Sequence, residues 1–298
     1  MCFAKLYGVA RHGSRSMAGR FYTRENAMIK SSVKFAALAA IALLPASAMA
    51  QVNGWTSHPR VFNDFSTSTL TITNSNTNPG TVVIDDRNLT DDGQGGNFAN
   101  RHDVCASTNG GGSDAVFSIN QGFTMSANVS LAVGSNAPRK EAGLRINSPV
   151  TGDALFLVNS DAGEIVAFGG GAPFFIFGSN GGGNGYTPGT TITMGMTYTP
   201  GVPNTTGATP ATLEYFIDRL PGVPGGEATS GPLAFSNTEG GPVNYNLCVY
   251  GQVSPANAND FITATFANLS VTVVPEPASL GLLSLAGVSL LVRRRKSA

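Results

Sequence analysis

The sequence predicts an all-β protein: an antiparallel β-sandwich over residues 51–273, flanked by two short hydrophobic segments that act as targeting signals. Short runs of Val, Ile, Leu and Phe alternate with polar residues at a period of two, as in strands with one buried face. Segments rich in Gly, Asn, Ser and Thr separate these runs and mark turns. No long stretch repeats apolar residues at the spacing of three and four that a helix needs.

The predicted strands share this alternation and recur at short intervals. In chain order they lie at residues 70–72, 82–84, 116–119, 123–131, 142–146, 154–158, 164–168, 191–198, 213–218, 245–252 and 261–273. Residues 94–100 and 181–183 are predicted loops, because so much glycine does not hold regular structure. About 220 residues are enough for one domain with a substantial core.

Residues 28–50 are a predicted signal peptide with a basic start, an apolar helix and a cleavage site. Ala48 and Ala50 form the small-x-small pattern that precedes cleavage, so the mature chain is predicted to begin at Gln51. Residues 1–27 show no apolar periodicity. We interpret them as an upstream extension of the true gene start, with a long basic leader as the alternative.

The C-terminal tail combines three features in order. They are the motif Pro275-Glu276-Pro277, an apolar run at 278–292 and the basic end Arg293-Arg294-Arg295-Lys296. The run is shorter than the about 20 residues that cross a bilayer, so it spans as a short helix only with thinning or snorkelling arginines. The arginines favour the cytoplasmic side, which places the preceding domain outside. The two prolines keep their segment extended and accessible to a protease. The alternatives are an anchor that is never cut and a buried hairpin.

This tail resembles the PEP-CTERM sorting signal of Gram-negative-type bacteria. The resemblance implies recognition by an exosortase-type membrane protease, after export through the Sec translocon across the inner membrane. It also implies a final place at the cell surface or in the extracellular matrix, in the setting of biofilm and exopolysaccharide export.

The mature region is acidic. Between Gln51 and Val274 there are seven basic and sixteen acidic residues, for a formal charge of −9. A nucleic-acid-binding protein needs a basic face to displace counterions, so we predict no nucleic acid partner.

Cys105 and Cys248 are the two cysteines of the mature region. In an exported protein they are predicted to form one disulfide, which closes a long loop. Two free buried thiols are the alternative.

The middle of the chain resembles the concanavalin A-like lectin/glucanase jelly roll. The likeness rests on the order of residues 123–133, 141–146, 164–170 and 213–218, with Tyr198 between the last two. It implies two curved sheets, with the long last strand returning beside the first ones. An immunoglobulin-like or other β-sandwich is the alternative.

Catalytic candidates are few. The glucanases of this fold carry a Glu-x-Asp-x-x-Glu triplet, which this sequence lacks. Glu214 and Asp218 share one face of a predicted strand but have no third acidic partner. His58 and His102 lack a Ser-plus-acid arrangement or a Cys/His metal spacing, and His102 is expected to be a surface or loop-packing residue and not a base. We therefore expect no catalytic residue.

Calcium is the one cofactor for which the sequence offers a site. Its candidate ligands are the carboxylates that crowd one loop region: Asp85, Asp86, Asp91, Asp92 and Asp103. Hard oxygen ligands on a flexible loop suit this ion, although the spacing is not that of an EF-hand. A solvated acidic loop without an ion is the alternative.

Three classes of function fit the sequence. The first is a non-enzymatic surface or matrix protein that binds extracellular polysaccharide, with Trp55, Tyr186 and Tyr250 as candidates for stacking on sugar rings or, alternatively, as core residues. The second is a divergent secreted glycoside hydrolase or lyase. The third is a purely structural adhesive module.

Overall fold

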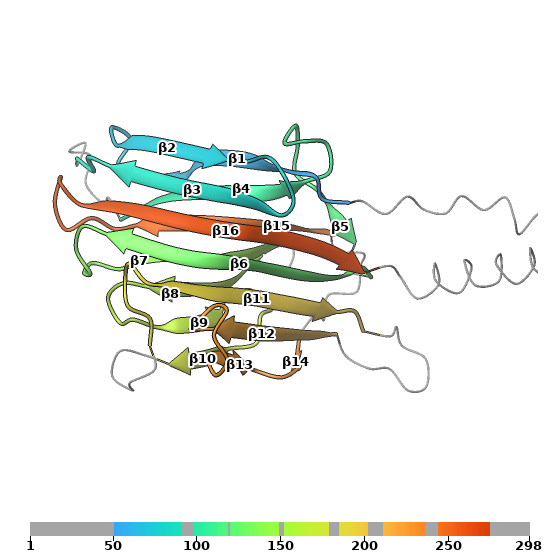
Figure 1. Cartoon of the computed structure of the whole chain (residues 1–298). Coiled ribbons are helices and arrows are strands. Elements are labelled where there is room, and N and C mark those ends of the chain that lie inside the picture. The colour runs from blue at the N-terminus through green and yellow to red at the C-terminus, as the bar shows by residue number, and fades with distance from the viewer. Residues whose placement is uncertain are drawn as a thin grey trace, which may run out of the picture. The chain divides into compact units, whose positions relative to one another are not determined.

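The protein is a two-layer sandwich of antiparallel strands (Figure 1). The structure is a computed structural model that describes residues 51–90, 98–118, 120–148, 152–178, 185–201, 211–235 and 244–274, and its regular elements there are all strands. The predicted all-β antiparallel sandwich is confirmed. In the described ranges, no helix has the length and hydropathy needed to cross a membrane.

Sheet A forms one layer. Its strands, in spatial order, are β1 (Gly54–Asn63), β4 (Asn100–Ser107), β15 (Asn244–Val253), β7 (Lys140–Ser148), β8 (Gly152–Asn159), β9 (Ile165–Phe168) and β10 (Phe175–Gly178). The short β5 (Phe117–Ser118) pairs with one end of β15.

Sheet B forms the other layer and lies in front in Figure 1. Its strands, in spatial order, are β13 (Glu227–Thr229), β12 (Thr212–Asp218), β11 (Thr191–Thr199), β6 (Gly122–Val133), β16 (Phe261–Val274), β3 (Gly80–Arg87) and β2 (Thr69–Asn74). The short β14 (Leu233–Ala234) pairs with β12.

The chain passes repeatedly between the two sheets, which is how a jelly roll connects its strands. β1 is followed by β2 and β3 in sheet B, and β4 returns to sheet A before β6 crosses back. The long β16 pairs with β3 on one side and β6 on the other, so the last strand lies beside an early one as predicted.

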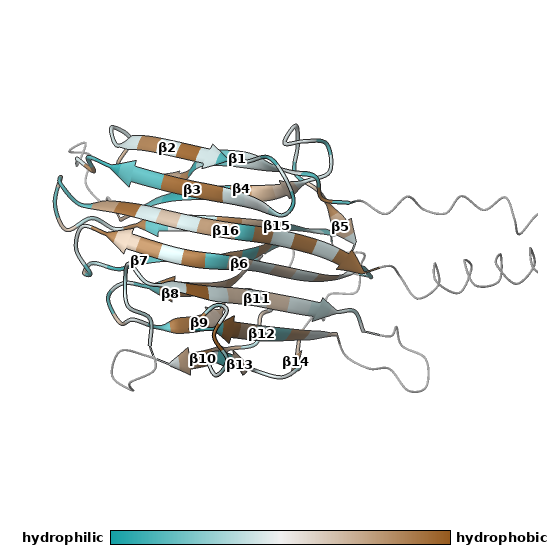
Figure 2. Ribbon diagram, viewed as in Figure 1, coloured by the Kyte–Doolittle hydropathy of each residue, from teal (hydrophilic) through white to brown (hydrophobic). Residues whose placement is uncertain are grey.

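The core lies between the sheets and follows the alternation of the sequence. Along β6 and β16, hydrophobic and hydrophilic residues alternate, and most of the hydrophobic ones are buried (Figure 2). Val129 on β6 and Phe266 on β16 occupy the same register and are both fully buried. This period of two is the reason that the sequence identifies the long strands.

Buried polar residues interrupt this core at two places. His102 on β4 is fully buried, and its Nε2 lies 2.9 Å from Oδ2 of Asp86 on β3. Its Nδ1 contacts the carbonyl oxygen of Pro59. At the second place the fully buried Lys140 lies with its Nζ 2.6 Å from Oδ2 of Asp260. The expectation that His102 is a surface or loop-packing residue is wrong, because His102 lies on β4 and strand alternation turns its side chain into the core.

Five strands were not predicted: β1, β4, β10, β13 and β14. Asn100, placed in a predicted loop, is the first residue of β4. The predicted loop at 181–183 lies outside the described residues.

Candidate ligand-binding site

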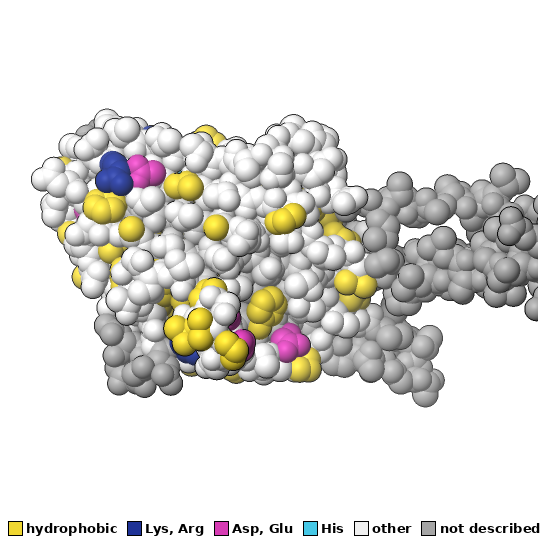
Figure 3. Space-filling view, viewed as in Figure 1, with side chains coloured by type: hydrophobic (Ala, Val, Ile, Leu, Met, Phe, Trp, Pro, Cys, Tyr) yellow, Lys and Arg dark blue, Asp and Glu magenta, His cyan; other side chains and the backbone are white. Residues whose placement is uncertain are grey.

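The two outer faces of the sandwich differ in chemistry. The outer face of sheet B, seen in Figure 3, is mostly uncharged. Its outward positions are occupied largely by hydroxyl side chains, among them Thr71, Thr73, Thr124, Thr193, Thr197, Thr263 and Thr265. Some of them bond to each other across strands, as do Thr124 Oγ1 and Thr197 Oγ1 at 3.1 Å.

The outer face of sheet A instead carries a charged cluster, defined by Arg101 and Asp103 on β4, Arg145 on β7 and Asp153 on β8. Strand alternation turns Arg101 and Asp103 outward because His102 and Val104 point into the core. Arg101 Nε lies 3.0 Å from Asp103 Oδ1, and its Nη1 lies 3.3 Å from Asp153 Oδ2. Arg145 contacts both carboxylates. Two guanidinium groups therefore bind two carboxylates. The four residues come from β4, β7 and β8, and the cluster also passes over β15, which lies between β4 and β7.

Arg101 lies over two aromatic rings. Its guanidinium carbon is 4.5 Å from the ring centre of Tyr250 and 5.8 Å from that of Phe62. Burial alone would lower the pKa of Arg101, but the charges of Asp103 and the groups around it raise that pKa above its usual value. Arg101 is only 4 % exposed, yet its Nη2 has no hydrogen-bond partner. A buried donor without an acceptor is unfavourable and indicates a place for an oxygen-bearing ligand or water.

The cluster continues beneath Arg101 into a buried tyrosine and a carboxylate. The Tyr250 hydroxyl donates to Oε2 of Glu141 on β7 at 3.1 Å, and both side chains are buried. Burial raises the pKa of Glu141, and burial together with the Glu141 charge raises the pKa of Tyr250 well above its usual value. Tyr250 thus stays a neutral hydroxyl with no access to solvent.

Arg139, the residue just before β7, closes one side of this network. Its Nε lies 3.3 Å from Asp161 Oδ1 and 3.5 Å from Glu141 Oε1, and its Nη2 contacts Glu164. The rim of the face is open at two points: Phe62 is 48 % exposed, and the Asp153 side chain is 35 % exposed.

The structure separates the two acids considered for catalysis. Glu214 and Asp218 lie four positions apart on β12, on the outer face of sheet B, which puts them about 13 Å apart along the strand. Paired carboxylates of glycosidases lie about 5–9.5 Å apart. Glu214 accepts a hydrogen bond from Thr229 and Asp218 from the Leu220 N–H, so both serve the β12–β13 connection.

The structure does not bring three of the calcium candidates together. Asp85 lies on the outer face of sheet B and pairs with Arg87, whereas Asp86 points into the core toward His102. Asp103 belongs to the charged cluster on the outer face of sheet A. Asp91 and Asp92 lie outside the described residues, and a calcium site at that loop stays a prediction.

Two of the three aromatic candidates for sugar stacking, Trp55 and Tyr186, are core residues, the alternative that the sequence left open, whereas Tyr250 is buried on the outer face of sheet A. Trp55 is 2 % exposed and donates from Nε1 to the carbonyl of Thr77, and Tyr186 is 3 % exposed. Tyr250 lies under Arg101. Sequence reasoning missed Phe62, the exposed ring beside the charged cluster. The one feature of the sequence that could have identified Phe62 is that it is a large apolar residue in a polar segment that contains a proline.

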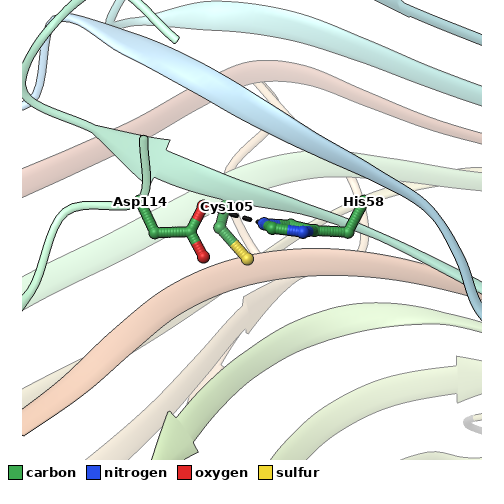
Figure 4. A group of neighbouring side chains, drawn as sticks. All are labelled: His58, Cys105 and Asp114. Carbon is green, nitrogen blue, oxygen red and sulfur yellow. Dashed lines mark hydrogen bonds and ion pairs between the residues drawn. The ribbon is translucent and has the colours of Figure 1, made fainter. Parts of the chain in front are cut away.

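A disulfide crosses the same face of sheet A. It joins Cys105 on β4 to Cys248 on β15, the predicted pair, at directly opposed positions. Close to it, His58 Nε2 on β1 lies 2.8 Å from Asp114 Oδ1 (Figure 4).

The targeting residues lie outside the described part, apart from Gln51 at its start. They include the cleavage residues Ala48 and Ala50, the motif Pro275-Glu276-Pro277 and the basic Arg293, Arg294 and Arg295. The predicted signal and tail helices lie there as well.

Comparison with known proteins identifies the tail. Residues 273–296 match the family model of the PEP-CTERM protein-sorting motif. A comparison with curated protein sequences found no match.

Several solved structures are similar to the sandwich. The family 7 alginate lyase A1-II' in complex with substrate is 11% identical, covers 77% of this chain and 96% of its own, and has a TM-score of 0.46. The alginate lyase from Corynebacterium sp. is 14% identical, with 74% and 95% covered and a TM-score of 0.46. The carbohydrate recognition domain of Emp47p is 13% identical, with 74% and 96% covered and a TM-score of 0.37.

The sorting motif has a direct consequence for the fate of the chain. It implies export and membrane anchoring, followed by processing of the chain as an exosortase substrate.

Proposed function

We propose that this is a non-enzymatic protein of the cell surface or extracellular matrix that binds polysaccharide through the outer face of sheet A. The Sec translocon exports it, and an exosortase-type protease removes its anchor. The observation that carries the proposal is Arg101, a buried guanidinium with an unsatisfied N–H beside an exposed aromatic ring.

The chemistry of the charged cluster suits sugar hydroxyl groups. At the rim Asp153 offers an acceptor and Phe62 a ring face, and Arg101, which contacts both, has an N–H donor without a partner. Fixed donors, fixed acceptors and an exposed aromatic ring are the groups that orient a polar ligand with apolar ring faces.

A neutral polysaccharide fits better than an acidic one. The formal charge of the cluster is zero because two arginines face two aspartates. The mature region as a whole carries a formal charge of −9. An anionic polymer would meet repulsion from the domain without a basic patch to offset it.

The geometry supports binding without cleavage. Tyr250 is fully buried, and its pKa is raised well above the usual value, so it is not placed to take a proton from a substrate. Asp103 and Asp153 are both engaged by guanidinium groups, and Glu214 and Asp218 are too far apart to act as a pair.

Binding of the purified chain to immobilised polysaccharides tests the proposal. The panel includes neutral polymers and uronate polymers, and each mixture is also assayed for cleavage products. We expect binding to at least one neutral polymer, and about tenfold weaker binding by Phe62→Ala, since the loss of one well-placed aromatic contact is worth about 1.4 kcal/mol or more. No cleavage product is expected.

Phe174→Ala is the matched control, because Phe174 is an exposed phenylalanine just before β10 at the other edge of sheet A. Equal loss in both variants, or no binding at all, would contradict the proposed site and favour a structural adhesive module. Cleavage products would favour the hydrolase or lyase.

A further inference from the structure

Four potential metal ligands meet at the disulfide. A ring nitrogen of His58, Cys105 Sγ and an Asp114 carboxylate oxygen all lie within 4.8 Å of one another, and their side chains point toward a common space (Figure 4). Cys248 Sγ is bonded to Cys105 Sγ and is therefore at the same place. We propose that, when the disulfide is reduced, these four side chains bind one thiophilic divalent cation of the zinc class.

The backbone holds the four ligands in position. Cys105 and Cys248 are directly opposed on neighbouring strands, and Thr56 on β1 is opposed to Cys105 on its other side. His58, two positions after Thr56, therefore projects from the same face of the sheet. Zinc bonds of about 2.0–2.3 Å place tetrahedral ligand atoms about 3.3–3.8 Å apart, so the observed cluster needs only small side-chain movements.

The chemistry of the donor set selects the ion. Two thiolates, one imidazole and one carboxylate form a closed four-coordinate set with the softness that zinc prefers. Calcium takes six to eight oxygen ligands and does not fit here. The site is thus distinct from the carboxylate loop that the sequence suggested for calcium.

The solvent exposure of the ligand side chains and the groups around them also suit a cation. The His58 and Asp114 side chains are 42% and 26% exposed, whereas both cysteines are buried, so the site opens to solvent on the side of its nitrogen and oxygen ligands. The Oγ1 of Thr56 is buried and has no hydrogen-bond partner. Its hydroxyl is available to donate to a thiolate, as groups around metal ligands commonly do.

The disulfide and the metal-bound pair of thiolates are two states of Cys105 and Cys248 that exclude each other. A dithiol reductant gives two electrons and two protons to the disulfide, which becomes two thiols while the reductant becomes a disulfide. Each thiol then releases its proton when its sulfur binds the cation.

Cobalt(II) in place of zinc tests the site. The purified chain, reduced with a dithiol and then freed of it, is titrated with cobalt(II) and compared with the oxidised chain. We expect one tightly bound ion in the reduced chain, with a sulfur-to-cobalt charge-transfer band and tetrahedral ligand-field bands, and neither band in the oxidised chain. His58→Ala and Asp114→Asn are expected to weaken binding at least about tenfold.

Glu227→Gln is the matched control, since this carboxylate lies on β13 at the edge of sheet B, and it should bind as the unaltered chain does. Cys248→Ser provides a second route, because it frees the Cys105 thiol without a reductant and leaves three ligands. Equal binding in both redox states, binding unaffected by His58→Ala and Asp114→Asn, or unfolding of both the reduced chain and Cys248→Ser would overturn the proposal. Polysaccharide binding is measured on the oxidised chain, so the two proposals fail independently.

Discussion

His102 is the residue whose role differs most from its expectation. Both of its ring nitrogens face acceptors, Asp86 Oδ2 and the Pro59 carbonyl oxygen. The ring therefore gives the Asp86 carboxylate a polar partner inside the core, where an unpaired carboxylate would be unfavourable. Because Pro59 lies where the register of β1 shifts between His58 and Phe62, the pair also fixes the part of β1 that presents Phe62 to the charged cluster.

His102→Leu is expected to lower the free energy of unfolding by about 3 kcal/mol, because it leaves the buried Asp86 carboxylate without its His102 partner. Urea unfolding measures the change. The double variant His102→Leu with Asp86→Leu removes both polar partners and should recover much of the loss. If the two single effects simply add in the double variant, the residues are not coupled as described.

Asp86 also predicts a response to acid. Burial raises its pKa, but hydrogen bonds from His102, Ser68 and Asn100 outweigh burial, and the net pKa lies below the ordinary value of 3.8. A lowered carboxyl pKa stabilises the fold above the unfolded value, and this contribution is lost as the pH falls through the folded pKa.

We therefore expect the unfolding free energy to fall below about pH 3.8, and to fall less steeply in Asp86→Asn, whose side chain does not titrate. Urea unfolding at a series of pH values between neutrality and pH 2 measures both slopes. Parallel curves for the two proteins would show that Asp86 does not drive the acid response.

At the level of elements, Gly143 marks a close approach between β7 and β8. A Cβ at this position would lie 2.5 Å from the Phe156 carbonyl oxygen and 2.8 Å from Leu157 Cα. Backbone atoms cannot move aside without disturbing the pairing of the strands. The absence of a side chain also leaves space beside Tyr250, which is opposed to Gly143 in the register.

Gly143→Ala should destabilise the fold by about 1–3 kcal/mol through this overpacking. Gly195→Ala on β11 is the comparison, because the atoms nearest to its Cβ would be those at the far end of the half-buried Phe216 ring, which is a side chain and is able to move away. Chemical denaturation of both variants is the measurement. A larger loss at Gly195 would refute the argument from backbone contact.

The sequence predicted the long strands well because each has one predominantly apolar face. β1 and β4 escaped prediction for opposite reasons. β1 is an edge strand with Pro59 inside it, and β4 places polar residues on both faces, with Asn100 and His102 buried inward. β10, β13 and β14 are too short for alternation to show.

The candidate site was predicted less completely than the fold. Asp103 was identified as a possible ligand, but for calcium, and its partners Arg145 and Asp153 come from strands β7 and β8. Only the order of strands in sheet A, β4-β15-β7-β8, brings them together. A strand order of this kind depends on tertiary packing and not on local pattern. The one local signal was the i, i+2 spacing of Arg101 and Asp103, which places both on the same face of a strand.

For the whole molecule, the sorting motif implies export and membrane anchoring before processing. Replacing Pro275 and Pro277 with alanine favours a continuous helix into the apolar run and hides the extended segment that a protease needs. We expect the chain to accumulate uncut in the inner membrane. Intact mass of the membrane-bound protein reports the retained tail, whereas the mass of a shortened chain at the cell surface would contradict this expectation.

The burial of Lys140 has a practical consequence for chemical modification. Lys140 is the one lysine between Gln51 and Val274, and its amine is enclosed with Asp260 in the interior. After removal of both targeting segments, the α-amino group of the mature N-terminus is the one primary amine open to acylating reagents. An activated ester should therefore attach a single label at one end of the molecule, giving a uniformly oriented protein on a sensor surface.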